Sequence, residues 1–314
     1  MTRIAVVMDA IETINYKKDS TLAMLWAAAA RDCELYYLQP QDLFWQEGAA
    51  AARCWPLEVY HDPQRWFSLA AVTTRLLSEF DIILMRKDPP FDMDYIYATY
   101  LLEQAAEAGV LVVNQPRSLR DANEKLFATR FAAAIAPTLV TTQKQQILDF
   151  IETHGEAVIK PLDGMGGASI FKLTRGDPNC GVIIETLTRH GRQLAMVQRY
   201  LAAIVNGDKR ILLINGKPVD YALARIPVGG ELRGNLAAGG RGVAQPLTER
   251  DREICRMVAP ELQRRGLIFV GIDVIGDHLT EVNVTSPTCI RELDAAFGLD
   301  IAGDLLDYLL AQRA

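Results

Sequence analysis

The sequence predicts an α/β protein whose first third forms a parallel sheet and whose remainder is of the α+β type. In the first third, short apolar runs alternate with helical stretches, which is the pattern of βαβ units. In the middle, a glycine-rich segment at 162–169 joins two apolar runs that favour strands. In the last third, two alternating runs meet at Gly276 and Asp277 and predict an antiparallel hairpin.

The first third is expected to hold buried strands and two intervening helices. The strands are placed at 4–8, 34–38, 81–85 and 110–113, and the helices at 21–31 and 95–109. The alanine-rich stretch 49–52 is assigned to a helix or a surface turn. The pattern breaks at 116–123, which predicts a boundary there, followed by a helix at 124–134. We therefore expect an N-terminal α/β domain over 1–122, on the substrate side of the site.

The rest of the chain is divided at residue 200 into a central and a C-terminal domain. For the central domain, 123–200, we expect helices at 143–154 and 181–190 and a strand that ends at Tyr200. For the C-terminal domain, 201–314, we expect strands at 210–214 and 218–226 and helices at 248–266 and 301–311. Six glycines fall within the sixteen positions 227–242, too many for a packed core, so this segment is predicted to be a mobile loop.

Composition and charge exclude several classes of protein. With 314 residues, 50% hydrophobic and 23% charged, the chain can form two or three packed units of a soluble protein. A net charge of −6 argues against nucleic acid as the main partner. No apolar run reaches the ~18 residues of a membrane span, and the first residues favour a strand over a signal peptide. Five cysteines without C-x-x-C spacing indicate a reduced, cytoplasmic protein without structural zinc.

The glycine-rich segment predicts a phosphate clamp. Gly164, Gly166 and Gly167 allow backbone N–H groups to approach a phosphate closely, and Lys160 lies just upstream. Ser169 replaces the third glycine of a dinucleotide fingerprint, and the chain continues as a strand instead of a helix, so neither that fingerprint nor a P-loop is present. We interpret the segment as a glycine hairpin over a nucleotide; the alternative is a simple tight turn.

The acidic hairpin of the last third predicts a metal site. With a turn centred near residue 277, Asp273 faces Glu281, and Asn283 on the same face lies opposite Gly271, which would leave room for a bound group. Two opposed carboxylates repel each other unless a cation lies between them. Hard oxygen ligands of this kind suit Mg²⁺ shared with phosphates. The alternative is a solvated hairpin face.

Positive side chains concentrate locally in this acidic chain. Between residues 207 and 241 there are six cationic residues and three acidic residues, and this local excess of positive charge favours a small anionic ligand. Arg210 and Arg225 lie in predicted strands, whereas Arg233 lies in the glycine-rich loop, interpreted as a lid. Arg86 follows a buried strand at its carboxyl end, where α/β sheets place ligands. For any single cation, the alternative is a surface salt bridge.

Taken together, these segments resemble the ATP-grasp carboxylate–amine ligases and, within them, the bacterial glutathione synthetases. The glycine hairpin is typical of the whole superfamily, whereas three other segments are more specific. These are Arg-Lys-Asp-Pro-Pro at 86–90, the glycine-rich loop that contains Arg233, and Asn-Val-Thr-Ser-Pro-Thr at 283–288. The resemblance covers nearly the whole chain and implies an ATP-grasp fold behind the N-terminal domain.

The resemblance also implies a role for each site residue. The implied nucleotide contacts are Lys125, Lys160, Gly164, Met165, Gly166, Gly167, the hinge Gln198, Arg199, Tyr200 and Leu201, and Asp208. The implied ligands of Mg²⁺, or alternatively Mn²⁺, are Asp273, Glu281 and Asn283. The implied substrate contacts are Arg86, Arg210, Arg225, Arg233, Ser286 and Thr288, and the three arginines 210, 225 and 233 are also the implied catalytic residues.

The implied reaction joins γ-glutamylcysteine to glycine with ATP, through an acyl phosphate, to give glutathione, ADP and phosphate. The family also implies a homotetramer that binds neither nucleic acid nor membranes. One alternative is another ATP-grasp ligase, such as a D-Ala–D-Ala ligase or a protein-tail glutamate ligase. Another is a nucleotide-binding module without chemistry, which predicts erosion of Arg210 or of the acidic hairpin; both are intact.

Overall fold

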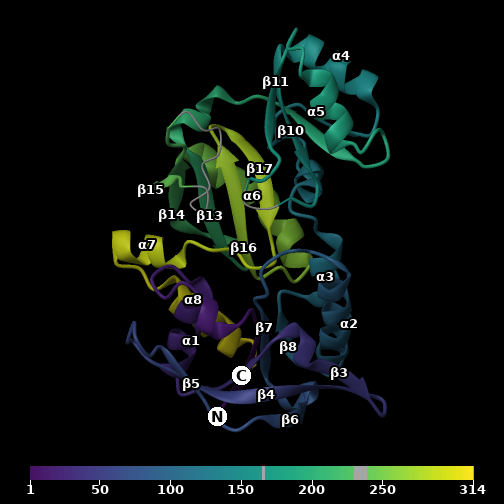
Figure 1. Ribbon diagram of the computed structural model, residues 1–314. Helices are drawn as coiled ribbons and strands as arrows, with labels where there is room; N and C mark the ends of the chain where they lie inside the picture. Colours follow the sequence, from purple (N-terminus) through teal and green to yellow (C-terminus); the bar gives the residue numbers. More distant parts are fainter. Residues whose placement is uncertain (165–166, 230–238, 314) are drawn as a thin grey trace.

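The computed structural model describes residues 1–164, 167–229 and 239–313, which form three sheets (Figure 1). The first sheet is built around four parallel strands in the order β2-β1-β7-β8. Their bounds are β1 (Arg3–Val7), β2 (Glu34–Leu38), β7 (Ile82–Met85) and β8 (Leu111–Val113). The predicted parallel sheet is therefore confirmed, with strand ends within one residue of those expected.

An antiparallel extension that the sequence did not predict widens this sheet. Its strands are β3 (Leu43–Gln46), β4 (Ala49–Val59), β5 (Phe67–Leu69) and β6 (Thr73–Leu76). The assignment of 49–52 to a helix or surface turn was wrong, because these alanines begin β4 and pair with β3. Alanine has little preference for strands, so local sequence carries no signal here. Ala50 and Ala52 instead fit a close-packed core, in which both are buried.

Helices cover both faces of the first sheet. α1 (Ser20–Ala29) packs on α8 (Ile301–Ala311), and α2 (Met93–Glu107) packs on α3 (Pro116–Asp121). The helix expected at 95–109 begins two residues earlier because Asp92 caps it, accepting a hydrogen bond of 3.0 Å from the Tyr95 N–H. Among the described residues, no helix is long and apolar enough to cross a lipid bilayer.

The helix expected at 124–134 was wrong. The chain forms α3 earlier, within the predicted break, and only a short 3₁₀ helix, η4 (Leu126–Arg130), follows. Pro116 at the first turn favours the start of α3. The Asn123 side-chain oxygen Oδ1 accepts from the backbone N–H groups of Lys125 and Leu126, at 3.1 and 2.9 Å, and so holds a turn where a regular helix would need to begin.

The second sheet is antiparallel, in the order β11-β10-β12-β9, with α4 (Lys144–His154) and α5 (Cys180–Leu187) packed on it. Its strands are β9 (Thr138–Thr141), β10 (Glu156–Pro161), β11 (Phe171–Thr174) and β12 (Ala195–Arg199). The glycine-rich segment joins β10 to its antiparallel partner β11, which confirms the predicted hairpin. This sheet has a hydrophobic core of its own, which includes Ile147, Ile159 and Ile184.

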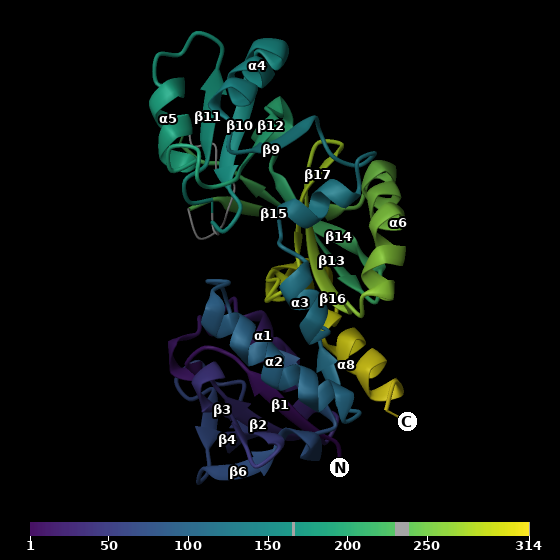
Figure 2. The same cartoon turned by 90° about the vertical axis from the view of Figure 1, so that its right-hand side faces the viewer.

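The third sheet is also antiparallel, in the order β15-β14-β13-β16-β17, which can be followed from left to right in Figure 1; Figure 2 shows the same sheet turned by 90°. Its strands are β13 (Asp208–Ile214), β14 (Lys217–Ile226), β15 (Arg241–Pro246), β16 (Phe269–Ile275) and β17 (His278–Asn283). α6 (Glu249–Arg264) packs against it, and α7 (Ile290–Phe297), which the sequence analysis missed, follows β17. The predicted end of the loop at residue 242 was wrong, because Arg241 and Gly242 already belong to β15.

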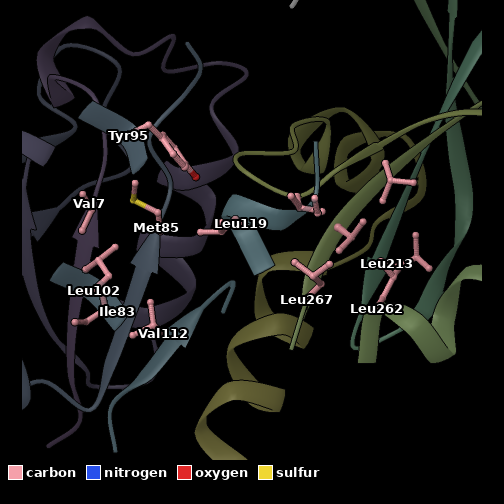
Figure 3. Close-up of a cluster of buried hydrophobic side chains, with 14 of the residues drawn as sticks. Val7, Ile83, Met85, Tyr95, Leu102, Val112, Leu119, Leu213, Leu262 and Leu267 are labelled. Atoms are coloured by element: carbon pink, nitrogen blue, oxygen red, sulfur yellow. The ribbon is translucent and has the colours of Figure 1, made fainter. Parts of the chain in front are cut away.

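The first and third sheets share their hydrophobic cores. One core runs from Val7, Ile83 and Leu102 to Leu213 and Leu262. Figure 3 shows Leu119 of α3 lying between these two groups. The alternate residues of β1, Ile4 and Val6, face a second shared core. These two sheets therefore form one packed body, while the second sheet is packed separately.

Asn114, directly after β8, links the same two sheets by hydrogen bonds. Its buried side-chain amide donates to the carbonyl oxygens of Phe269 and Val284, at 2.8 and 2.7 Å. Its oxygen accepts from the Phe269 N–H at 2.9 Å. Three backbone groups at the ends of β16 and β17 thus depend on one side chain for their partners.

Replacing Asn114 by alanine is expected to destabilise the fold. Three buried backbone groups lose their partner, and the expected loss is about 2–4 kcal/mol in the free energy of unfolding. Urea denaturation followed by tryptophan fluorescence measures it. The matched control is Asn179→Ala, since Asn179 is exposed and its side chain caps no helix N–H. Equal denaturation midpoints for the two variants would contradict the role assigned to Asn114.

Candidate active site

A cavity of about 390 Å³ lies where the three sheets meet. The second sheet contributes the glycine hairpin, Lys160 and Gln198; the third contributes Arg210 and Glu281, among others. The segment after β7 contributes Asp88 and Pro89, and the segment after β17 contributes 285–289. This volume is within the range of small-molecule sites.

The acidic hairpin pairs as predicted. Asp273 lies opposite Glu281, and Gly271 lies opposite Asn283. The turn is tighter than expected, because Ile275 pairs with His278, and a β-bulge between Asp273 and Val274 shifts the register by one residue. Without that bulge, Asp273 would face Thr280. The bulge therefore brings the two carboxylates together at the cavity.

Asp273 is held by two arginines at the centre of the site. The guanidinium of Arg210 binds it bidentately, with Nε–Oδ1 of 2.5 Å and Nη2–Oδ2 of 3.0 Å. Arg225 Nη2 lies 2.9 Å from Oδ2, and Asn283 Nδ2 donates to the same oxygen at 3.3 Å. Burial raises the pKa of Asp273, but the two guanidinium groups outweigh burial and hold that pKa below its usual range.

Asp208 shares Arg225 with Asp273. Its Oδ2 lies 2.5 Å from Arg225 Nη2, whereas its Oδ1 is buried and accepts no hydrogen bond within the described part of the chain. Burial, opposed by Arg225 and reinforced by Asp273, raises the pKa of Asp208 to about 6. A buried acceptor without a partner, in a cavity wall, is a place for a ligand donor.

Two lysines converge on Glu281. Lys125 Nζ and Lys160 Nζ lie 3.7 and 3.6 Å from Glu281 Oε1, and both lysines are buried. Lys125 also contacts Glu124 and donates to the backbone carbonyl of Gly164 in the glycine hairpin. Burial lowers the pKa of Lys160, whereas at Lys125 the charges of Glu281 and Glu124 overcome burial and raise the pKa. Burial and Glu281 raise the pKa of Glu124.

Among the described residues, the charges that line the cavity balance. Five of these side chains are cationic, namely Lys125, Lys160, Arg199, Arg210 and Arg225. Five are acidic, namely Asp88, Glu124, Asp208, Asp273 and Glu281. These side chains together thus offer a polyanionic ligand no excess of positive charge. An additional cation would therefore favour the binding of a polyphosphate here.

The predicted metal ligands fit a hard cation. Glu281 and Asn283 line the cavity, and among the described residues Asp273 Oδ1 accepts from the Arg210 Nε–H alone, which leaves it lone-pair capacity. No group of three or more His, Cys, Asp or Glu side chains that could hold a metal occurs within residues 1–164, 167–229 and 239–313. A cation here would therefore complete its shell with water and ligand oxygens, as Mg²⁺ commonly does.

The predicted hinge 198–201 lies along the cavity wall. The backbone N–H groups of Arg199 and Tyr200 donate to the carbonyl oxygens of Pro137 and Glu156, at 3.0 and 3.1 Å. A bound base would therefore meet other backbone groups of this segment. Gly167, in the glycine hairpin above, has φ of +80°, which only glycine adopts without strain.

Arg86 lies behind the cavity wall and does not line the cavity. Its Nε donates to Thr21 Oγ1 at 3.1 Å and its Nη2 to the Pro287 carbonyl at 3.0 Å. Burial lowers the pKa of Arg86. In this structure Arg86 thus supports the 285–289 segment from behind. Ser286 and Thr288 of that segment do line the cavity.

Several residues of the cavity wall were not predicted as site residues, among them Asp88, Glu124 and Cys289. Asp88 accepts from Ser286 Oγ at 2.5 Å, and Glu124 contacts Lys125. Asp88 belongs to the 86–90 segment that carries the family resemblance, which was the available signal. Cys289 also lines the cavity and has φ of +89°, a strained value for a side chain of this type. Three other predicted residues, Met165, Gly166 and Arg233, lie outside the described residues.

Solved structures with the same fold include an ATP-grasp ligase. D-cycloserine synthetase DcsG is 15% identical, with a TM-score of 0.69, over 99% of this chain and 100% of that one. The ATP-grasp ligase PsnB, solved with precursor peptide PsnA2 and AMPPNP, is 18% identical, with a TM-score of 0.65, over 99% and 98%. At this identity the likeness establishes the fold, which is the ATP-grasp fold expected from the sequence.

Sequence relatives are much nearer. A glutathione synthetase of Pseudomonas putida is 61% identical over 307 residues, 98% of this chain and 97% of the relative. That of Escherichia coli (strain K12) is 55% identical over 312 residues, 99% of each. The prokaryotic glutathione synthetase N-terminal domain matches residues 2–120, and the prokaryotic glutathione synthetase ATP-grasp domain matches 124–298. The chain therefore belongs to the prokaryotic glutathione synthetase family of ATP-grasp ligases.

Proposed function

We propose that this chain joins γ-glutamylcysteine to glycine with ATP and releases glutathione, ADP and phosphate. The observation that carries the proposal is one cavity where buried lysines, buried arginines and the acidic hairpin meet under the glycine hairpin. Its relatives at 55–61% identity are glutathione synthetases along nearly their whole length.

The nucleotide is proposed to lie between the second and third sheets. Lys125 and Lys160 would contact its phosphates, under the glycine hairpin of Gly164 and Gly167. The hinge 198–201 would meet the adenine, and the unpartnered Asp208 Oδ1 would accept a hydrogen bond from a hydroxyl of the nucleotide. These assignments use the side chains that already converge in the cavity.

Mg²⁺ is the proposed metal, held by Glu281, Asn283 and Asp273 Oδ1. When bound, it would neutralise phosphate charge for which the described side chains of the cavity supply no excess of positive charge. Mn²⁺ is the alternative, since it accepts the same oxygen ligands.

The peptide and glycine are proposed to bind on the side of the 285–289 segment. Ser286 and Thr288 line the cavity there, and Arg210 and Arg225 line the same cavity. Arg86 would act by holding the Pro287 carbonyl. Arg233 is proposed to contact the ligand, and the loop 227–242 is proposed to act as a lid. Arg233 and most of this loop lie outside the described residues.

In the proposed reaction, the cysteinyl carboxylate of γ-glutamylcysteine attacks the γ-phosphorus of ATP. An O–P bond forms, the bond to ADP breaks, and an acyl phosphate results. The neutral amine of glycine then attacks the acyl carbon. A C–N bond forms, phosphate leaves, and the amine loses a proton to solvent. Arg210 and Arg225, charged and fixed by Asp273, would stabilise the developing negative charge on the transferred group and on the tetrahedral intermediate.

The proposal extends to the setting of the enzyme. The five cysteines, at 33, 54, 180, 255 and 289, are free thiols, which is compatible with the proposed reduced cytoplasm. A homotetramer is proposed from the family resemblance, and size-exclusion chromatography with light scattering measures it.

The test is ADP formation with ATP and Mg²⁺, in which γ-glutamylcysteine and glycine are supplied together and then omitted in turn. Turnover is expected only with both, together with the mass of glutathione. Turnover with D-alanine or with glutamate instead would keep the ligase chemistry and overturn the substrates. ATP binding without turnover on any pair would favour the non-catalytic module.

A further inference from the structure

Gly271 on β16 is surrounded by groups that leave no space for a side chain. A Cβ atom built there would lie 2.9 Å from Arg210 Cδ, 3.3 Å from Arg210 Nε and 2.9 Å from Pro287 Cβ. From the sequence, the absence of a side chain at position 271 was predicted to leave room for a bound group. The structure shows that the Arg210 side chain occupies that room.

The path of Arg210 explains why the space is needed. Gly271 pairs with Leu212 on β13, and Arg210 pairs with Asp273, two residues further along the same strand pair. On its way to Asp273, the Arg210 side chain crosses the surface of β16 directly over Gly271. With Nε on Oδ1 and Nη2 on Oδ2, the guanidinium is fixed in one plane by both oxygens of Asp273.

Among the described residues, the three atoms nearest to a Cβ at position 271 all belong to Arg210 and Pro287. The φ of Gly271 lies outside the left-handed region, so its backbone conformation is open to other residues. Its opposite neighbour across the hairpin is Asn283. The constraint at this position is therefore steric and comes from Arg210 and Pro287.

We propose that Gly271 is a positioning residue that sets the place of the Arg210 guanidinium relative to the reacting groups. A contact of 2.9 Å with a Cβ atom cannot persist, so a methyl group at position 271 must move Arg210, Pro287 or both. Displacing a group that stabilises the transition state by about 1 Å can lower the rate by on the order of 10²-fold. This inference deepens the proposed function and depends on it.

The first test compares Gly271→Ala with the wild-type enzyme in the glutathione-forming assay. We expect kcat to fall by on the order of 10–10²-fold, with KM for ATP changed less than threefold, because the nucleotide side of the cavity is untouched. The matched control is Gly276→Ala in the same hairpin. Gly276 has φ of +57°, and its Cβ would lie 2.9 Å from Ala203 Cβ, so this variant is also strained. Its kcat is expected to remain within threefold of wild type.

A double-mutant cycle separates the two neighbours of Gly271. In an Arg210→Ala background the colliding Cδ and Nε atoms are absent, so Gly271→Ala is expected to lower kcat by less than threefold further. A full additional fall in that background would overturn the proposal, because the effect would then pass through Pro287 or through general destabilisation.

A readout that needs no activity keeps this inference separable from the proposed reaction. The Nε–H group of Arg210 gives a ¹⁵N–¹H NMR signal, assigned by its loss in Arg210→Lys. In Gly271→Ala this signal is expected to shift or to exchange faster with solvent, since its bond to Asp273 is disturbed. An unchanged signal would overturn the proposal even with an inactive wild type, while a changed signal with no glutathione formation would sink only the proposed function.

Discussion

Replacing Arg210 by alanine is expected to lower kcat by on the order of 10²–10³, the usual cost of one preorganised charge-stabilising donor. The guanidinium lines the cavity, is buried, and is oriented by both oxygens of Asp273. In the proposed reaction it would therefore require no reorganisation when negative charge develops on the transferred phosphoryl group. Single-turnover measurement of ADP and glutathione formation separates this chemical effect from product release.

The adjacent residue provides a matched control. Lys209 is also buried on β13 and also paired with a buried carboxylate, Asp251 of α6, but side chains alternate along a strand, so it points to the opposite face. Leaving a buried charge without its partner is expected to lower the free energy of unfolding by roughly 3–5 kcal/mol. Asp273 keeps Arg225 when Arg210 is removed, so Lys209→Ala should lose at least as much stability as Arg210→Ala while its kcat stays near wild type. Near-normal turnover in Arg210→Ala, or equal kcat losses in both, would contradict the role of Arg210.

The acidic hairpin could be predicted from the sequence, because its geometry depends on the alternation of side chains along each strand and on the pairing of the two strands. Asp273, Glu281 and Asn283 share one face of a hairpin because side chains alternate, and that relation holds in the structure. The β-bulge beside Asp273 could not be predicted, because it arises from the tighter turn at Gly276 together with pairing to β13. The predicted turn was placed slightly too late in the sequence, but the predicted pairs are still found because the bulge shifts the register by one residue.

Contacts between segments distant in sequence escaped prediction. Arg86 follows a buried strand, as expected, but its partners Thr21 and Pro287 lie 65 and 201 residues away. Only packing of the first sheet against the segment after β17 shows that Arg86 lies behind the cavity wall. The same holds for Ala50 and Ala52, whose strand is specified by neighbours on both sides and not by their own preference.

Glu281 belongs both to the proposed metal site and to the surroundings of the two lysines. Glu281 lies close to Lys125 and to Lys160, and it faces Asp273 across the hairpin. A phosphate near the two lysines would compete with Glu281 for their charge. A divalent cation between Glu281 and the phosphate would relieve this repulsion. Nucleotide and metal are therefore expected to bind with positive coupling, each raising the affinity for the other.

Replacing Glu281 by glutamine is expected to raise the Mg²⁺ concentration that gives half-maximal activity by on the order of 10²-fold. Removing an outer-shell partner of a metal ligand already lowers metal affinity by about this factor, and the loss of a ligand itself should cost at least as much. The substitution keeps the size of the side chain and removes its charge, so one hard ligand becomes a weaker one. The effect is measured by titrating the free metal ion at saturating ATP, γ-glutamylcysteine and glycine. Glu249→Gln is the control, because Glu249 is exposed and pairs only with Arg256 among the described residues.

The alternative role for Glu281 predicts a different pattern. If it served only to hold Lys125 and Lys160 in place, at 3.7 and 3.6 Å, its loss would free both lysines for the phosphates. KM for ATP would then fall or stay constant, and the metal requirement would not change. A raised metal requirement that excess Mg²⁺ or Mn²⁺ restores places Glu281 on the metal. An unchanged requirement places it on the lysines, and the cation would then have to be held by Asn283, Asp273 and the phosphates alone.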